Sequence, residues 1–330
     1  MRQVKGCKMR ATATANSNIA FIKYWGNIDE SLRLPANPSL SMNLDGLYTE
    51  TTVEWHPEQQ GDSLNINGQS ADERATDRVS QHLSALRKRL DINYSAHVDS
   101  VNNFPMGAGI ASSAASFAAL TVAAVAAAGA ALSERELTCL ARLGSGSASR
   151  SVPSGFVEWV TGLSHAESFA FTIAPRDHWG LVDLVAIVHA GHKEVGSREG
   201  HTSASTSEFQ TARVKTAAQR LDVCRQALLE RDFASFASVV EHDSDMMHAV
   251  MMTSKPPLFY WRPSSLVLMD AVRRWRSEGL RVCYTLDAGP NVHCVCVASD
   301  ADELGERIVQ LPGVERVLRA SVGGGAEVSA

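Results

Sequence analysis

A glycine-rich turn followed by an alanine-rich run most constrains the fold of this chain, and it spans residues 101–132, VNNFPMGAGIASSAASFAALTVAAVAAAGAAL. The pattern predicts a strand ending near Pro105, a turn and then a helix. Glycine lets the backbone approach a ligand closely, and the start of a helix carries unpaired N–H groups and partial positive charge. The stretch therefore favours a phosphate-binding loop, in which the hydroxyls of Ser112 and Ser113 cap the helix, bind phosphate oxygens or hold Mg²⁺. A serine-capped turn before a core helix fits the same residues, because neither a Walker A lysine nor a GxGxxG fingerprint is present.

The composition is that of an ordinary enzyme, with 45% hydrophobic and 20% charged residues over 330 positions. That length suggests two lobes. A net charge of −5 and the lack of a Lys/Arg run disfavour nucleic acid as a partner. Ser and Thr interrupt the alanine-rich residues 114–132, which favours a buried packing helix over a membrane span. No signal peptide is expected. The six cysteines lack metal-site or disulfide spacing, so we expect reduced thiols in a cytoplasmic protein.

Hydrophobic periodicity along the rest of the chain predicts antiparallel strands with interspersed helices, the α+β class. Helices are expected at 71–90, 133–143, 208–229, 232–251, 264–277 and after 301, and strands within 39–55, 94–101, 181–190 and 281–298. Residues 39–55 predict two antiparallel strands in succession. Ser133 and Glu136 form a capping-box signal, and Asn65–Gly68 is typical of a tight hairpin turn. We expect a loop at the polar residues 191–207 and a frayed tail after Gly323.

Three further stretches contain candidate catalytic side chains. Lys23 lies in the apolar segment NIAFIKYWGN, where an ammonium group needs an anionic partner unless it reaches solvent at a strand end. Arg150 follows a serine-rich segment and could bind a carboxylate or phosphate through its planar fork, although a surface loop is the alternative. Asp287 lies in the turn of YTLDAGPNVH, where a structural cap is the simpler interpretation. If the chain closes Asp287 onto Lys23, the carboxylate becomes a candidate to orient or deprotonate a hydroxyl.

Together the four stretches resemble the mevalonate diphosphate decarboxylase and phosphomevalonate decarboxylase family of the GHMP kinase superfamily. That family carries the motifs NIAxxKYWGK, NNFPTAAGLASSA, GSGSA[CS]RS ending in GGFxEW, and TxDAGPN, which resemble residues 18–26, 102–114, 144–159 and 285–291. The resemblance implies the GHMP kinase fold, with an N-terminal ribosomal protein S5-like ATP-binding lobe (1–180), a C-terminal ferredoxin-like lobe (181–330) and the active site between them. It also implies ATP and Mg²⁺ as cofactors, a small-molecule substrate and a homodimer.

The resemblance further assigns roles to individual residues. Asp287 and Lys23 match the family's catalytic aspartate and its neighbouring lysine, and Arg150 matches the group that fixes the substrate carboxylate. Substrate contacts are implied for Asn18, Tyr24, Asn27, Ser145, Ser147, Ser197 and Arg198. ATP contacts are implied for Asn103, Pro105, Gly107, Ala108, Gly109, Ser112 and Ser113, with Ser112 also placed at the metal.

The chain departs from the family pattern at Asn27, where the family has a lysine directed toward the distal phosphate of a diphosphate substrate. The glycine loop and the four residues before Phe156 differ as well. Loss of that lysine favours ATP-dependent decarboxylation of mevalonate 5-phosphate to isopentenyl phosphate. The alternative is mevalonate 5-diphosphate giving isopentenyl diphosphate, because Arg198, Arg74 and Lys193 remain as replacement cations. A mevalonate 3-kinase that stops after phosphorylation and an inactive binding protein on the same fold are the other hypotheses.

Overall fold

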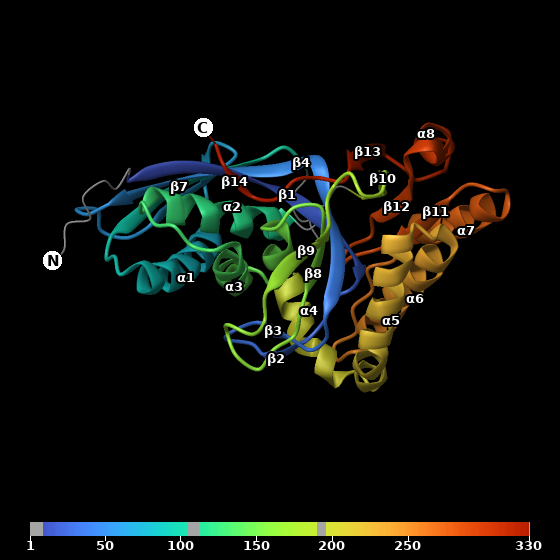
Figure 1. Ribbon diagram of the computed structural model, residues 1–330, viewed down its shortest axis with the longest axis horizontal. Coiled ribbons are helices and arrows are strands. Elements are labelled where there is room, and N and C mark those ends of the chain that lie inside the picture. Colours follow the sequence, from blue (N-terminus) through green and yellow to red (C-terminus); the bar gives the residue numbers. More distant parts are fainter. Residues whose placement is uncertain (1–8, 105–111, 190–195, 330) are drawn as a thin grey trace.

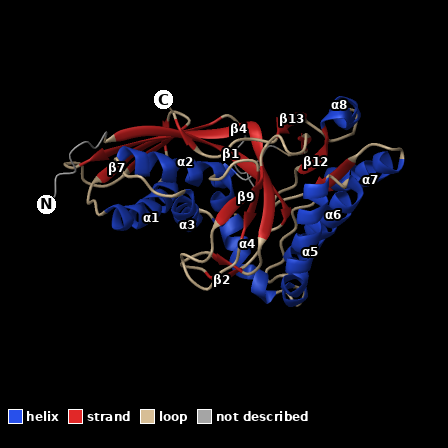
Figure 2. Ribbon diagram, in the orientation of Figure 1, coloured by secondary structure: helices blue, strands red, loops and turns tan. Residues whose placement is uncertain are grey.

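The protein is described here by a computed structural model that covers residues 9–104, 112–189 and 196–329. It contains two main β-sheets that lie side by side with helices packed on both (Figure 1, Figure 2). The helices are α1 (Glu73–Leu90), α2 (Ser112–Ala127), α3 (Glu134–Gly144), α4 (Ser197–Ser203), α5 (Gln210–Glu230), α6 (Phe233–Thr253), α7 (Pro263–Ser277) and α8 (Ala301–Val309). Short 3₁₀ turns cover Gly146–Ser151, Ala204–Thr206 and Ala298–Asp300.

The strands complete the set of elements. The larger sheet contains β1 (Arg10–Ile22), β4 (Ser39–His56), β5 (Ser63–Ile66), β6 (Gln69–Ser70), β7 (Ser95–Asn102), β8 (Phe156–Trp159), β9 (Ala170–Ala174) and β14 (Glu327–Val328). The smaller sheet contains β10 (Leu181–Ile187), β11 (Val282–Thr285), β12 (Val292–Val297) and β13 (Arg316–Ser321). A two-stranded ribbon of β2 (Asn27–Asp29) and β3 (Leu34–Pro35) projects beside them.

The larger sheet has the order β14-β1-β4-β7-β5-β6, and β8 and β9 continue it from β4. Helices α1, α2 and α3 cover one of its faces (Figure 1). Most residues of α2 are buried, and alanine is the commonest among them, so their small side chains let the helix lie close to the sheet. The indole N–H of Trp55 on β4 donates to the carbonyl of Ala124 in α2 at 3.0 Å, which fixes the helix on the strand. None of the helices in the described ranges is long and apolar enough to cross a membrane.

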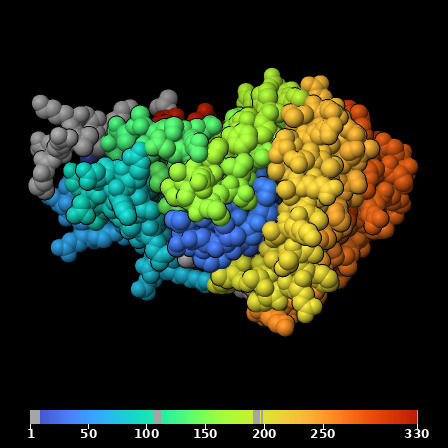
Figure 3. All heavy atoms as spheres, turned by 60° about the horizontal axis from the view of Figure 1, so that its bottom comes forward, coloured from blue at the N-terminus to red at the C-terminus, as the bar shows by residue number. Residues whose placement is uncertain are grey.

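The smaller sheet has the antiparallel order β11-β12-β10-β13. Successive residues of β10 face opposite sides of it: Leu184 packs with α7 and α8, whereas Val185 packs with α5, α6 and the ends of β1 and β4. The core around Val185 is therefore shared by the N-terminal and C-terminal halves of the chain. On the surface, the yellow and gold atoms of α5 and α6 adjoin the blue and green atoms of the N-terminal half (Figure 3).

Several local predictions are confirmed. The Ser133 side chain accepts from the backbone N–H of Glu136, and the Glu136 carboxylate accepts from the backbone N–H of Ser133, so the capping box starts α3. The predicted hairpin turn joins β5 to β6, and both of its central residues, Asn67 and Gly68, have positive φ. Mirror-image turns of this kind match the twist of the flanking strands.

Three expectations are wrong. Residues 39–55 form one long strand, β4, whose ladder with β1 continues through an irregularity rather than a turn. The expected loop at 191–207 contains α4 and a 3₁₀ turn from Ser197 onward. The tail after Gly323 is not frayed: β14 pairs with β1, and the N–H of Gly323 donates to the Asn43 carbonyl at 2.8 Å. The tail packs so closely against the Val152 carbonyl oxygen that a Cβ at Gly325 would clash with it, so only glycine fits there.

Candidate active site

A cavity of about 880 Å³ lies between the two halves and is lined by eight of the eleven predicted site residues whose side chains the structure describes. Its lining includes Lys23, Tyr24, Ser112, Ser113, Ser145, Ser147, Arg150 and Asp287. Asn18 and Asn27 lie directly behind it, because each bonds to a lining side chain, Arg150 and Tyr24 respectively. Pro105, Gly107, Ala108 and Gly109 fall outside the described residues. Ser197 and Arg198 lie in the first turn of α4, and their side chains are likewise not described.

Lys23 and Asp287 form an ion pair at the bottom of the cavity. The Lys23 Nζ donates to Asp287 Oδ1 at 2.6 Å; the lysine side chain is 1% exposed and the aspartate side chain 24% exposed. Burial lowers the pKa of the Lys23 ammonium group despite the neighbouring carboxylate. Burial alone would raise the pKa of Asp287, but the positive charges of Lys23, His293 and Arg150 and the hydrogen bond from Lys23 together outweigh it and hold that pKa below 3.8. Asp287 is therefore an ionised acceptor that is still reached from the cavity.

Buried charges on the C-terminal helices fix the backbone of Lys23. Asp243 on α6 accepts the Lys23 backbone N–H at 2.6 Å and also binds the Nε of Arg220 at 2.7 Å. Arg213 on α5 donates to the carbonyls of Lys23 and Trp25. Sequence reasoning missed these residues, since Asp243 and Arg213 lie in helical stretches that carry no motif. A charged residue on the apolar face of a predicted helix is the one signal that could have marked them.

Arg150 lines the same cavity as the ion pair and lies in the 3₁₀ turn Gly146–Ser151. Its guanidinium donates to the Ser39 hydroxyl at 2.7 Å and to Asn18 Oδ1 at 3.2 Å, and the side chain is 3% exposed. Burial lowers the pKa of Arg150 to about 10, so the group stays charged near neutral pH. Its Nε has no hydrogen-bond partner among the described residues. A buried guanidinium with an unused N–H at a cavity is suited to a planar anion such as a carboxylate.

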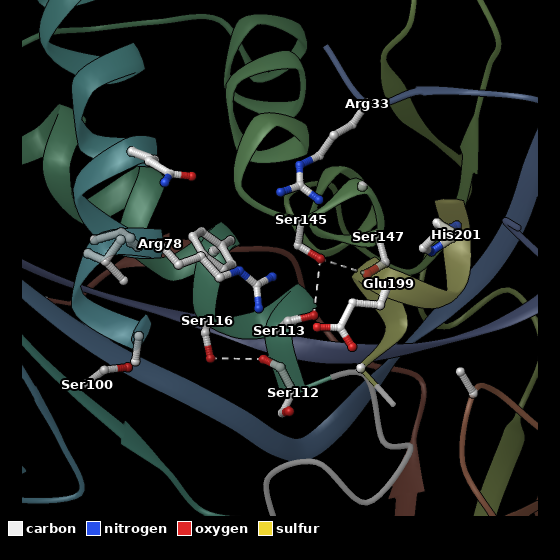
Figure 4. A pocket seen from close by; sticks show the side chains of 18 of the residues that line it. Arg33, Arg78, Ser100, Ser112, Ser113, Ser116, Ser145, Ser147, Glu199 and His201 are labelled. Carbon is white, nitrogen blue, oxygen red and sulfur yellow. Dashed lines mark hydrogen bonds between the residues drawn. The ribbon is translucent and has the colours of Figure 1, made fainter. Parts of the chain in front are cut away.

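Serine hydroxyls converge on the middle of the cavity (Figure 4). Ser113 at the start of α2 lies 3.1 Å from the Ser145 hydroxyl, which lies 3.3 Å from that of Ser147. Ser112 also lines the cavity from the first turn of α2. Asn103 is engaged elsewhere: its amide donates to the Gly46 carbonyl and accepts from the Tyr48 N–H, so it supports the strand end before the glycine loop.

The donor set fits a magnesium–nucleotide complex rather than a dedicated metal cage. No group of three His, Cys, Asp or Glu residues suited to a metal occurs in the described ranges. Mg²⁺ with a nucleotide takes most of its ligands from phosphate oxygens and water, so a hydroxyl such as that of Ser112 is a sufficient protein contact. The N–H groups at the start of α2 suit phosphate oxygens.

Helix α4 closes the cavity over the Tyr24–Trp25 segment, a contact that the sequence did not predict. The imidazole of His201 stacks on Tyr24 with ring centroids 4.1 Å apart, and its Nδ1 accepts the Gly26 N–H at 3.0 Å. Glu199 on the same helix pairs with Arg74 of α1 at 2.6 Å. Arg33, on the β2–β3 ribbon, also reaches into the cavity toward Ser145 (Figure 4).

Gly146 lets the Tyr24 ring lie against the 3₁₀ turn, because a Cβ there would come 2.5 Å from the ring. We expect Gly146→Ala to displace Tyr24, lowering the free energy of unfolding by roughly 1–3 kcal/mol and raising KM. Thermal unfolding and steady-state kinetics measure both effects. Gly305→Ala in α8 is the matched control, since its Cβ would make only an ordinary contact with Leu184 of β10. Normal kinetics in Gly146→Ala would contradict the predicted substrate contact of Tyr24.

Comparison with known proteins agrees with this geometry. A model of the diphosphomevalonate decarboxylase-like N-terminal domain matches residues 15–170, and a model of the mevalonate 5-diphosphate decarboxylase C-terminal domain matches residues 183–322. The diphosphomevalonate decarboxylase of Ganoderma lucidum is 36% identical over 91% of this chain and 82% of its own length. That of Saccharomyces cerevisiae is 36% identical over 92% of this chain and 82% of its own length.

Solved structures give the same answer. The mevalonate diphosphate decarboxylase of Enterococcus faecalis superposes with a TM-score of 0.91 at 35% identity, covering 97% of this chain and 98% of that one. A complex of MDDEF with MVAPP, AMPPCP and magnesium superposes equally well, with a TM-score of 0.91 at 36% identity over 97% of this chain and 98% of that one. The GHMP-kinase type of fold, the two-domain architecture and the use of ATP and Mg²⁺ are thereby confirmed. The chain is an ATP-dependent decarboxylase and belongs to the diphosphomevalonate decarboxylase family.

Proposed function

We propose that this enzyme converts mevalonate 5-diphosphate and ATP to isopentenyl diphosphate, CO₂, ADP and phosphate. The observation that carries the proposal is the Lys23–Asp287 ion pair, which lies in one cavity with Arg150 and the serines at the start of α2. The names of the relatives support the diphosphate, which the sequence offered as the alternative. The names of these relatives give no support to mevalonate 5-phosphate, the substrate that the sequence favoured.

The ionised Asp287 is suited to hold the substrate's tertiary hydroxyl and to take its proton as that oxygen attacks a phosphoryl group. Bound nucleotide supplies the phosphoryl group, and Mg²⁺ neutralises its charge. Lys23 keeps Asp287 ionised and places positive charge beside the transferred group. The hydroxyl oxygen becomes a phosphate ester, which is a far better leaving group than hydroxide.

Arg150 is suited to hold the substrate carboxylate in line with the carbon–oxygen bond that breaks. Loss of CO₂ leaves the electrons of the broken carbon–carbon bond to form the new double bond, and phosphate departs with the electrons of the carbon–oxygen bond. Atoms and charges balance without a redox partner. Arg150 contributes by positioning and by excluding other orientations, since its own hydrogen bonds to Asn18 and Ser39 fix its plane.

A second candidate substrate, mevalonate 5-phosphate, is favoured by the surroundings of Asn27. Its Oδ1 accepts from the Tyr24 hydroxyl at 2.5 Å, and its Nδ2 donates to the Glu30 carboxylate at 2.9 Å. The position that would carry a cation toward a distal phosphate therefore carries a neutral amide that holds a carboxylate nearby. This arrangement adds negative charge where a second phosphate would bring more.

Steady-state kinetics on mevalonate, its 5-phosphate and its 5-diphosphate, for the wild type and Asn27→Lys, distinguish the two substrates. We expect the wild type to have the highest kcat/KM on the diphosphate and Asn27→Lys to change the diphosphate-to-monophosphate ratio less than about threefold, under roughly 0.7 kcal/mol. A wild type that prefers the monophosphate, with a tenfold or larger shift toward the diphosphate in Asn27→Lys, would assign the second candidate instead. Asn27→Gln is the neutral control.

Several other predictions remain proposals. We retain the individual roles assigned to Asn18, Tyr24, Ser145, Ser147, Ser197 and Arg198 at the substrate, and the lobe boundary near residue 180. A homodimer and a cytoplasmic location also remain predictions.

A further inference from the structure

A further buried ion pair, which the proposed reaction does not use, lies in the smaller sheet next to Asp287. The Nδ1 of His293 on β12 is 2.6 Å from Oδ2 of Asp183 on β10, and both side chains are completely buried. The strands place them diagonally, since Val185 is paired with His293 and Asp183 with Val295. Their neighbours on the same face, Val185 and Val295, are apolar core residues.

The pair is poorly explained as a stabilising element. Buried ion pairs are often no better for stability than apolar side chains of similar volume. Here Asp183 Oδ1 has no hydrogen-bond partner among the described residues, so the carboxylate is incompletely satisfied. An arrangement with that desolvation cost, beside the apolar side chains of Val185 and Val295, calls for a role outside packing.

The sheet brings His293 close to the catalytic pair. Thr285, the last residue of β11, is the paired neighbour of His293, and Asp287 follows it by two residues. Asp287 begins a turn in which the Gly289 N–H donates to its carbonyl at 2.8 Å, and the preceding residue, Leu286, is tied to Ser244 of α6. The charged groups that face His293 are Asp183 from β10, Asp287 from the turn and Lys23 from the segment after β1.

The electrostatics of two buried histidines show what Asp183 does. Burial lowers the pKa of His82, which bonds to the Thr121 hydroxyl, to about 3. Burial also acts to lower the pKa of His293, but the charge of Asp183, its hydrogen bond and the charge of Asp287 together outweigh burial and raise that pKa above 6.5. His293 in turn helps Lys23 to lower the pKa of Asp287. The four groups thus alternate in charge as Asp183, His293, Asp287 and Lys23.

We propose that His293, held protonated by Asp183, is a positioning residue that presents a second positive charge to the Asp287 carboxylate from the sheet beneath the turn. It touches neither substrate nor nucleotide and acts only through Asp287. The proposal rests on the proposed role of Asp287. It makes the site sensitive to pH in one direction: the charge is present at and below the pKa of His293 and is lost as pH rises through it.

The first test measures kcat between pH 6 and 9.5. We expect the wild-type kcat to fall about tenfold at alkaline pH, because His293 loses its positive charge beside Asp287. His293→Gln should show the reduced rate at all these pH values, His293→Lys should keep the higher rate, and Asp183→Asn should move the fall to lower pH. His82→Gln, an equally buried histidine without a carboxylate, should keep the wild-type profile.

Two outcomes would overturn the proposal: His293→Gln with wild-type kcat at pH 6, or Asp183→Asn with an unmoved profile. If His293→Gln fails to fold, Asp183→Asn and His293→Lys still decide the question. A second test is independent of turnover, because coupling between two sites is reciprocal. Histidine NMR should show the His293 titration move to lower pH in Asp287→Asn, by about threefold in its proton dissociation constant or more. An unchanged titration contradicts the inference, whereas absence of CO₂ release by the wild type contradicts the proposed function alone.

Discussion

Replacing Asp287 by asparagine should reduce turnover on the order of a thousandfold or more while ATP still binds. The amide keeps the shape of the side chain but can neither take the hydroxyl proton nor complement Lys23, so proton transfer and orientation are both lost. Glu158, the other carboxylate in the four motif stretches, cannot substitute for it because Arg225 binds both of its oxygens at 2.7 and 2.9 Å. Asp287 is thus the one carboxylate of those stretches that reaches the cavity.

The measurement is single-turnover product formation together with nucleotide binding. Asp300→Asn is the matched control: it also removes a paired carboxylate of the C-terminal half, one that binds Arg281 on the surface, and it should keep normal turnover. Thermal unfolding of each variant separates catalysis from stability, since Asp287→Asn leaves the buried Lys23 without its carboxylate partner. Retention of more than about a tenth of the activity, a barrier change under roughly 1.4 kcal/mol, would contradict the assignment.

Replacing Arg150 by lysine should lower kcat/KM about a hundredfold although the charge is conserved. Lysine loses the planar fork, and it cannot reach both Ser39 and Asn18 with the geometry of a guanidinium, so the substrate carboxylate would no longer be held in line. Most of the loss should appear in CO₂ release. Phosphoryl transfer depends more directly on Asp287 and Lys23.

Arg225→Lys provides the control for this variant. Arg225 also forms a bidentate ion pair, with Glu158, but it does not line the cavity. Its replacement by lysine should therefore lower stability slightly and leave the kinetics nearly unchanged. Comparison of the two variants removes the general effect of an arginine-to-lysine exchange. Normal kinetics in Arg150→Lys would show that Arg150 supports the fold alone.

The sequence predicted those parts of the site that depend on local motifs. Lys23 in an apolar segment implied an anionic partner, and the structure places Asp287 there. Asp243 and Arg213 could not be predicted in the same way, because they lie far along the chain in helices and reach Lys23 only after the two halves pack. Long-range packing of that kind leaves no spacing signal in the sequence.

The errors in the fold have a similar origin. Glycine and alanine after Gly323 suggested a frayed tail, yet those small residues allow the close approach through which the tail joins the larger sheet. The polar composition of 191–207 suggested a loop, but helix α4 forms where His201 stacks on Tyr24 and Gly200 packs on Trp25. In both places a tertiary contact outweighs local composition.

The most direct test of the central claim is the ratio of CO₂ to ADP formed from carboxyl-labelled mevalonate 5-diphosphate, measured on the wild type with Asp287→Asn as the blank. If the cavity aligns hydroxyl and carboxylate as proposed, ATP consumption and decarboxylation are coupled, and the ratio is one throughout the time course. Formation of ADP without CO₂ from both the diphosphate and the monophosphate would instead identify a mevalonate 3-kinase. Absence of both products would identify a binding protein. Either result would contradict the proposed decarboxylation.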